Sequence, residues 1–160
     1  MKKITKIFSV FITVFLFASV VVLASSSEKA SAAPAPKLTQ FEVLGCSTPE
    51  IYNYQNGKTY ISSENLSKGK LAGSTVYVVT RQMGYRRLSY SVDGGSYISA
   101  TQIDKFPIQG YDCNGARAVV GWVSVESITG LSAGQHTIRA LCNSTVVTGS
   151  MSDAVTVTMG

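Results

Sequence analysis

The chain of 160 residues is poor in the side chains that most enzyme chemistry needs, with one His, three Cys and only 14% charged residues. Its formal net charge of +5 comes mostly from residues 1–32, which hold four of the 14 basic residues and one of the nine acidic residues. Residues 33–160 therefore carry only +2. This weak charge argues against a nucleic-acid-binding surface, which needs a strongly basic patch.

Motifs for catalysis and ligand binding are also missing from the sequence. It contains no calcium loop of the D-x-D type, no phosphate-cradling Gly loop and no G-x-S-x-G elbow. The carboxylates of residues 33–160 are scattered, without a close pair suited to acid–base work. His136 has no second His and no paired carboxylate nearby in sequence, so a hydrogen bond across its turn is favoured over a catalytic or metal-binding role. We predict a protein without enzymatic activity, cofactor or metal.

The N-terminus has the layout of a secretory signal peptide. The basic stretch Met1–Lys6 precedes 18 residues, Ile7–Ala24, whose only polar members are Ser and Thr, and the small residues Ala30–Ala32 follow. We predict that residues 1–32 are removed and that the protein is secreted, with no membrane span after cleavage. The alternative is an uncleaved anchor, because a bilayer is spanned by about 20 apolar residues.

The remaining sequence favours strands and turns over helices. Residues 33–37, Ala and Pro followed by one Lys, predict an extended spacer, and residues 38–160 are of a size for one domain. Polar and apolar residues alternate in 87–93, 135–142 and 153–159, as in half-buried strands. Residues 75–80 and 118–125 are more continuously apolar, which is typical of central strands covered on both faces.

Turn residues separate these segments and indicate how they connect. Asn56-Gly57, between Tyr-rich segments, predicts a hairpin, and Asp93-Gly94-Gly95 predicts a second turn with residues 97–101 as the returning strand. About eight or nine short strands result, with no helical segment to connect parallel pairs. The expected fold is an all-β antiparallel sandwich of two sheets, with a closed barrel as the alternative.

Three segments make this expectation more specific. Leu88–Gly95 resembles the central hairpin of bacterial secreted immunoglobulin-like and fibronectin-III-like domains. Ile128–Ile138 is similar to the turn before their penultimate strand, and Ala154–Thr158 to their last strand. The resemblance covers roughly residues 74–159 and implies an immunoglobulin-like sandwich. It does not extend to residues 38–72, where we expect an N-terminal strand and an extra hairpin.

The three cysteines allow three different single disulfides. Cys113 precedes one expected strand and Cys142 ends the next, and two successive antiparallel strands bring these points to the same pole. Cys142 also lies on the inward face by alternation. We therefore favour a Cys113–Cys142 bridge over Cys46–Cys142 and Cys46–Cys113. Cys46 is then buried or pairs with another chain.

Aromatic residues are the candidate ligand contacts. A two-residue turn at Asn56-Gly57 places Tyr52 and Tyr54 on one face, where two rings could stack on sugar rings or pack on the sandwich. Trp122 has the opposite parity to Val123 and Val125, which points it outward unless a bulge at Gly121 resets the phase, but packing in the core is the favoured alternative.

These observations predict a secreted, non-catalytic binding or adhesion module whose partner is an extracellular glycan or protein. One alternative is a structural surface or envelope component that assembles through Cys46 or edge strands. A small secreted hydrolase is the third hypothesis. The sequence leaves the identity of the ligand and the oligomeric state open.

Overall fold

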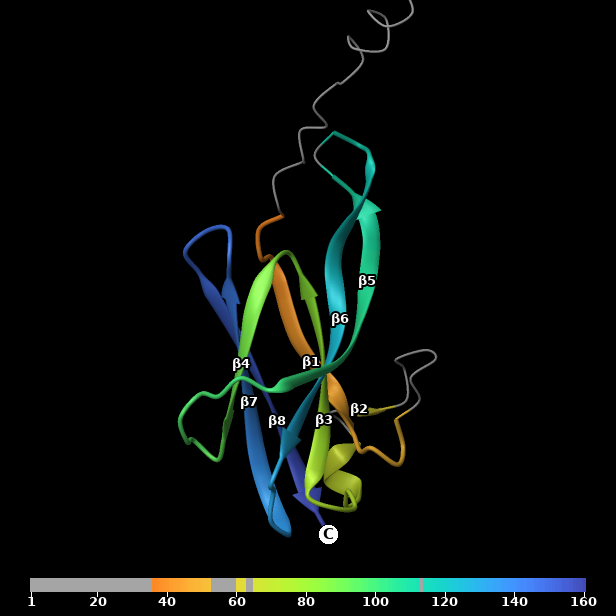
Figure 1. Ribbon diagram of the computed structural model, residues 1–160, viewed down its shortest axis with the longest axis vertical. Helices are drawn as coiled ribbons and strands as arrows, with labels where there is room; N and C mark the ends of the chain where they lie inside the picture. The colour runs from red at the N-terminus through yellow and green to blue at the C-terminus, as the bar shows by residue number, and fades with distance from the viewer. Residues whose placement is uncertain (1–35, 53–59, 63–64, 113) are drawn as a thin grey trace, which may run out of the picture. The chain divides into compact units, whose positions relative to one another are not determined.

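The computed structural model describes residues 36–52, 60–62, 65–112 and 114–160, which belong to one compact unit, Pro34–Gly160 (Figure 1). The eight strands found among these residues form two antiparallel sheets, in agreement with the expected all-β class. Within these residues no helix is both long enough and apolar enough to cross a bilayer.

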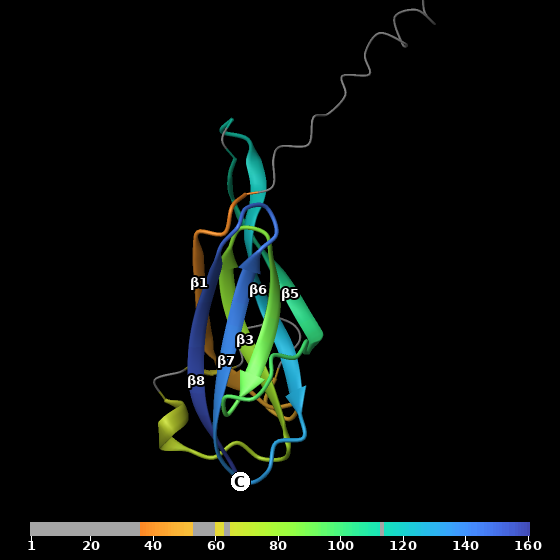
Figure 2. The ribbon, with the colours of Figure 1, turned by 90° about the vertical axis from the view of Figure 1, so that its left-hand side faces the viewer.

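The first sheet has five strands in the order β2-β1-β3-β6-β5, and the second has three in the order β4-β7-β8. The strands of the first sheet are β1 (Gln40–Ser47), β2 (Ile61–Ser62), β3 (Thr75–Met83), β5 (Thr101–Tyr111) and β6 (Arg117–Thr129). Those of the second sheet are β4 (Arg86–Val92), β7 (Gly134–Ser144) and β8 (Ser150–Met159). A short 3-10 helix, η1 (Leu66–Lys68), lies between β2 and β3. Figure 2 views the molecule from the side of the second sheet.

The alternating patterns predicted three strands correctly. Residues 87–93, 135–142 and 153–159 correspond to β4, β7 and β8, which pair with one another in the second sheet. The continuously apolar segments 75–80 and 118–125 lie in β3 and β6. These two strands pair without interruption in the middle of the first sheet, with Thr75–Met83 opposite Gly121–Thr129. Because β3 and β6 have a strand on either side, they are central strands, as their composition indicated.

The prediction that residues 97–101 form a returning strand after the turn at Asp93 was wrong. Residues 97–100 make only an isolated bridge, in which Ile98 exchanges both backbone hydrogen bonds with Tyr90. The chain then crosses to the first sheet, where β5 pairs with β6 from Thr101 to Tyr111. The long pairing with β6 satisfies many more backbone groups than a short hairpin with β4 would, and this choice depends on the position of a strand distant in sequence.

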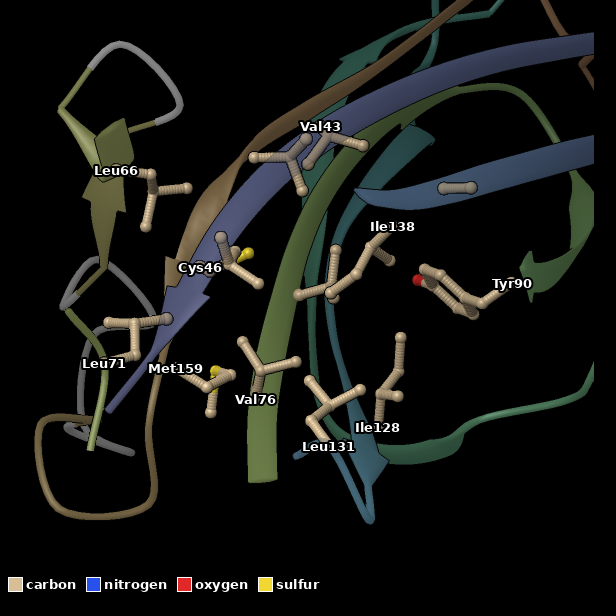
Figure 3. Packing of buried hydrophobic residues seen from close by; sticks show 14 of the residues in the cluster. Val43, Cys46, Leu66, Leu71, Val76, Tyr90, Ile128, Leu131, Ile138 and Met159 are labelled. Carbon is tan, nitrogen blue, oxygen red and sulfur yellow. The ribbon is translucent and has the colours of Figure 1, made fainter. Parts of the chain in front are cut away.

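The main core lies between the two sheets. Val76, Val78 and Ile128 from the first sheet meet side chains of the second sheet, among them Tyr90 and Ile138 (Figure 3). Alternate residues of each strand point to the same face, so this core follows directly from the period of two. The expected inward set Val155, Val157 and Met159 is buried here, as predicted.

A second, smaller apolar cluster covers the opposite face of the first sheet. Tyr52, from the segment after β1, packs with Tyr77, Val79 and Val125, so β3 and β6 are covered on both faces. The predicted Asn56-Gly57 hairpin lies outside the described residues, and the flanking β2 is only two residues long.

Candidate functional site

Tyr52 does not provide the surface stacking platform that the sequence suggested. Its ring is buried against the first sheet and meets Tyr77 edge-on, with ring centroids 5.6 Å apart. Its hydroxyl donates a hydrogen bond to Oδ2 of Asp104 at 3.2 Å. This corresponds to the packing alternative, because a buried ring has no face to offer a sugar. Tyr54, its expected partner, lies outside the described residues.

Trp122 faces the second sheet, near one end of the sandwich. It pairs with Gln82 of β3 and Pro107 of β5, and it shares its face with Ser124 and Glu126. The indole is partly buried, and the Lys105 ammonium lies 4.1 Å from its ring centroid, a cation–π contact. One face of the indole is thus taken by Lys105, so a ligand would have to displace that side chain to stack there.

A buried ion pair connects the two sheets on the face of β6 to which Trp122 belongs by alternation. Arg86, the first residue of β4, places Nη2 2.8 Å from Oγ of Ser124 and 3.4 Å from Oε1 of Glu126. The side chains of Arg86 and Glu126 are both more than nine-tenths buried. Gln82 also donates a hydrogen bond to the hydroxyl of Ser124. The cluster therefore ties β4 to β6 with polar contacts where the apolar core ends.

Burial shifts the pKa values of Glu126 in this cluster and of the neighbouring Tyr90 and Lys105. Desolvation raises the pKa of Glu126 above its usual value, while the Arg86 charge acts in the opposite direction. Desolvation also raises the pKa of Tyr90 well above its ordinary value. Lys105 has a lowered pKa, first because of desolvation and second because of the Arg86 charge. Since the Arg86 and Glu126 charges pair with each other inside the sandwich, we interpret the cluster as a structural connection between the sheets.

His136 forms a second polar cluster with Asp93 and Ser132. Nδ1 of His136 lies 2.7 Å from Oδ2 of Asp93, and Nε2 lies 3.4 Å from Oγ of Ser132. The hydroxyl, imidazole and carboxylate of these residues follow one another in space in the same order as in a Ser-His-Asp catalytic triad. However, Nε2 also lies 2.9 Å from the carbonyl oxygen of Ser132, which only accepts hydrogen bonds. An Nε2–H that donates to this carbonyl cannot take a proton from the serine.

The contacts of His136 agree with the hydrogen bond across the turn that the sequence favoured. The imidazole connects the turn before β7 with Asp93, the residue after β4. Asp93 has a φ of 51°, and its other carboxylate oxygen accepts a hydrogen bond from the backbone N–H of Thr137. Sequence reasoning explained Asp93 only as a turn residue, because His136 is 43 positions away.

The predicted Cys113–Cys142 disulfide is not observed. Cys142 is a free, fully buried thiol, and Cys113 lies outside the described residues, so the pairing stays a prediction. Cys46 is also free and fully buried, and burial raises its pKa to about 12. A buried, protonated thiol is unsuited to pairing with a neighbouring chain, which weakens the assembly hypothesis through Cys46.

Exposed apolar side chains gather at one end of the second sheet, and sequence reasoning missed them. Tyr85 in the β3–β4 turn is 41% exposed, and Val146 and Val147 in the β7–β8 loop are 40% and 41% exposed. Met151 at the start of β8 is also exposed. The two connections lie at the same end of the sandwich in Figures 1 and 2, and the backbone N–H of Thr145 donates to the carbonyl of Tyr85 at 3.3 Å. We call Tyr85, Arg87, Val146, Val147 and Met151 the loop pole.

Local hydrogen bonds hold the valines of the loop pole in place. The hydroxyl of Ser144 accepts hydrogen bonds from the backbone N–H groups of both Val146 and Val147. In the other connection, Gly84 has a φ of +103° and packs against the backbone of Lys37, where a side chain would collide. The sequence signal was the Val146-Val147 pair in a loop of Ser, Thr and Gly, but its exposure depends on how the loop is placed.

In the described part of the chain, no three His, Cys, Asp or Glu side chains gather in a way that could hold a metal ion. No curated protein and no solved structure matches the sequence. A family described as a domain of unknown function (DUF4879) matches residues 33–157, and the chain therefore belongs to this family.

Proposed function

We propose that this protein is a secreted, non-catalytic binding module with an immunoglobulin-like fold, and that its loop pole contacts an extracellular partner. The signal-peptide layout of residues 1–32 supports secretion. The family match begins at residue 33, which is the residue we expect to start the exported chain.

The order of the strands supports the immunoglobulin-like assignment. Constant-type immunoglobulin domains have strands A-B-E-D in one sheet and C-F-G in the other. If β1 is strand A and β3–β8 are strands B–G, the observed orders β1-β3-β6-β5 and β4-β7-β8 follow the same pattern. The short strand β2 is then an addition at the edge of the first sheet. A sandwich of this kind presents its loops at two poles, and binding by loops at one pole is a common use of the fold.

The observation that carries the binding function is the exposure of Tyr85, Val146 and Val147 on two adjoining connections and of Met151 at the start of β8. Isolated exposed apolar residues are ordinary, but a group of them on neighbouring loops is typical of an interaction site. The absence of activity is supported by His136, whose Nε2 is engaged by the Ser132 carbonyl. A glycan or a protein is the partner expected from the sequence.

The function can be tested with the exported protein and preparations of bacterial cell envelope. We expect sedimentation with the envelope to be lost in the double variant Val146→Ser/Val147→Ser and kept in Ile51→Ser. Ile51 is a matched control because it is 43% exposed but lies between β1 and β2, outside the loop pole. Equal binding by both variants would contradict the role of the loop pole. A hydrolytic rate abolished by His136→Ala would contradict the non-catalytic assignment.

A further inference from the structure

The loop pole combines apolar side chains with exposed basic ones. Arg87 follows the Tyr85 turn and is exposed, on the strand that pairs with the β7–β8 hairpin. Lys37 is also exposed, and it adjoins the same turn because the N–H of Tyr85 donates to the carbonyl of Pro36. These cations have no ion pair among the described residues, whereas Arg81 pairs with Glu42 and Arg86 with Glu126.

Asp153, the acidic residue of β8, does not neutralise the positive charge of Arg87 and Lys37. Asp153 lies two residues after Met151, and its carboxylate accepts hydrogen bonds from the backbone N–H groups of Val43 and Ala154. These contacts hold the Asp153 side chain toward β1. Arg87 and Lys37 therefore lie next to the β3–β4 turn that adjoins the β7–β8 loop, so this end of the second sheet is both apolar and positively charged.

The size of the loop pole limits the kind of partner. A stable protein–protein interface buries about 800 Å² on each partner and involves about 20 residues or more. Four half-exposed apolar side chains fall far short of this, and three of them are aliphatic rather than the aromatic rings that glycans stack on. A lipid surface needs no matching shape: a few apolar side chains enter the interface, while nearby cations meet anionic headgroups.

From this combination we propose that the loop pole docks onto the surface of an anionic lipid bilayer, with Val146 and Val147 entering the interface and Arg87 and Lys37 meeting the headgroups. This proposal rests on the binding function proposed above and names the partner of the same surface. Attachment of this kind is weak, reversible and sensitive to salt, because exposed charges are screened over about 10 Å at 0.1 M ionic strength. The end of the second sheet that carries the β3–β4 and β7–β8 connections then faces the membrane.

The test is flotation of the exported protein with vesicles of phosphatidylglycerol mixed with phosphatidylcholine, compared with vesicles of phosphatidylcholine alone. We expect binding to the anionic vesicles only, and weaker binding as salt is added. Val146→Ser/Val147→Ser should reduce the affinity about tenfold because apolar area is lost from the contact. Arg87→Gln should reduce it about fivefold, which corresponds to about 1 kcal/mol for one basic residue near an anionic surface. Ile51→Ser should bind like the original protein.

A fluorescence measurement tests the orientation. Trp122 is the only Trp, so the variant Tyr85→Trp/Trp122→Phe carries one indole at the loop pole, and Ile51→Trp/Trp122→Phe is the matched control. We expect a blue shift of emission with anionic vesicles for the first variant and none for the second. Equal shifts, or no vesicle binding by the original protein, would overturn the proposal. If envelope binding still depended on Val146 and Val147 while vesicles were not bound, the proposed function would stand and the partner would be a glycan or protein.

Discussion

Nδ1 of His136 and Oδ2 of Asp93 lie 2.7 Å apart, although the two residues are 43 positions apart in sequence. The imidazole thus fastens the end of β4 to the start of β7, and it also bonds the Ser132 carbonyl in the preceding turn. Both ring nitrogens have oxygen acceptors, so the protonated, doubly donating form of the ring satisfies the site best.

The stability of the protein should therefore depend on pH through His136. The hydrogen bond to Asp93, followed by that to the Ser132 carbonyl, raises the pKa of His136 above 6.5 in the folded state. The pKa of Asp93 is lowered, first by its hydrogen bond to His136 and then by that to Thr137. The stabilisation from His136 is complete below pH 6.5 and is lost as the pH rises through the folded pKa. The contribution of Asp93 is present above its unfolded pKa of 3.8 and is lost as the pH falls through its lower folded value.

Urea unfolding of the original protein and of His136→Gln at two pH values checks this prediction. We expect the difference in the free energy of unfolding to be larger at pH 5.5 than at pH 8.5. Because the chain has one His, its titration by NMR gives the folded pKa directly. A midpoint at or below 6.5 would contradict the arrangement.

Removing only one partner of the Arg86–Glu126 ion pair should destabilise the folded protein. Glu126→Gln and Arg86→Met each leave one buried partner without its counterpart, and we expect each to lower the free energy of unfolding by about 3 kcal/mol. The double variant Arg86→Met/Glu126→Gln should lose less than the sum of the two single effects. Denaturant unfolding of the four proteins measures the coupling, and strictly additive effects would show that the two residues act independently.

Gly121 should not tolerate a side chain. A Cβ there would collide with the carbonyl oxygen of Gln82 and lie 2.9 Å from Sδ of Met83, because β3 passes close to β6. We expect Gly121→Ala to lower the free energy of unfolding by about 1–3 kcal/mol. The control is Gly149→Ala, where a Cβ meets nothing within 4 Å and little change is expected. Thermal unfolding distinguishes them, and a neutral Gly121→Ala would contradict the close approach.

Thiol labelling should show that Cys46 and Cys142 are protected by burial, and it tests the predicted disulfide. Cys46 and Cys142 are fully buried, and burial raises their pKa values to about 12 and about 11. We expect neither to react with iodoacetamide in the folded protein and Cys46 to react after unfolding without a reductant, together with Cys142 if its thiol is free as in the structure. If only Cys46 reacted after unfolding, the Cys113–Cys142 bridge predicted from the sequence would be present.

The period of two in residues 87–93, 135–142 and 153–159 was sufficient to predict three strands and their buried faces. The Gly-rich turn before His136 likewise indicated a hydrogen bond across that turn. These features are local, since a strand's faces are set by alternation and a turn by its own residues. The candidate ligand contacts fared less well, because alternation shows which residues share a face but not what covers that face. Tyr52 is buried by the outer surface of β3 and β6, to which it is not adjacent in sequence.

The sequence by itself determined an all-β chain with two antiparallel layers and few reactive side chains. Only the tertiary structure decided that β5 pairs with β6, that Asp93 meets His136, and that Tyr85 lies beside the loop of Val146 and Val147. Each of these depends on which distant segments meet when the two sheets pack. Such long-range pairing is stabilised only when the two sheets are assembled. The segments that take part therefore show no periodic pattern that identifies their distant partner.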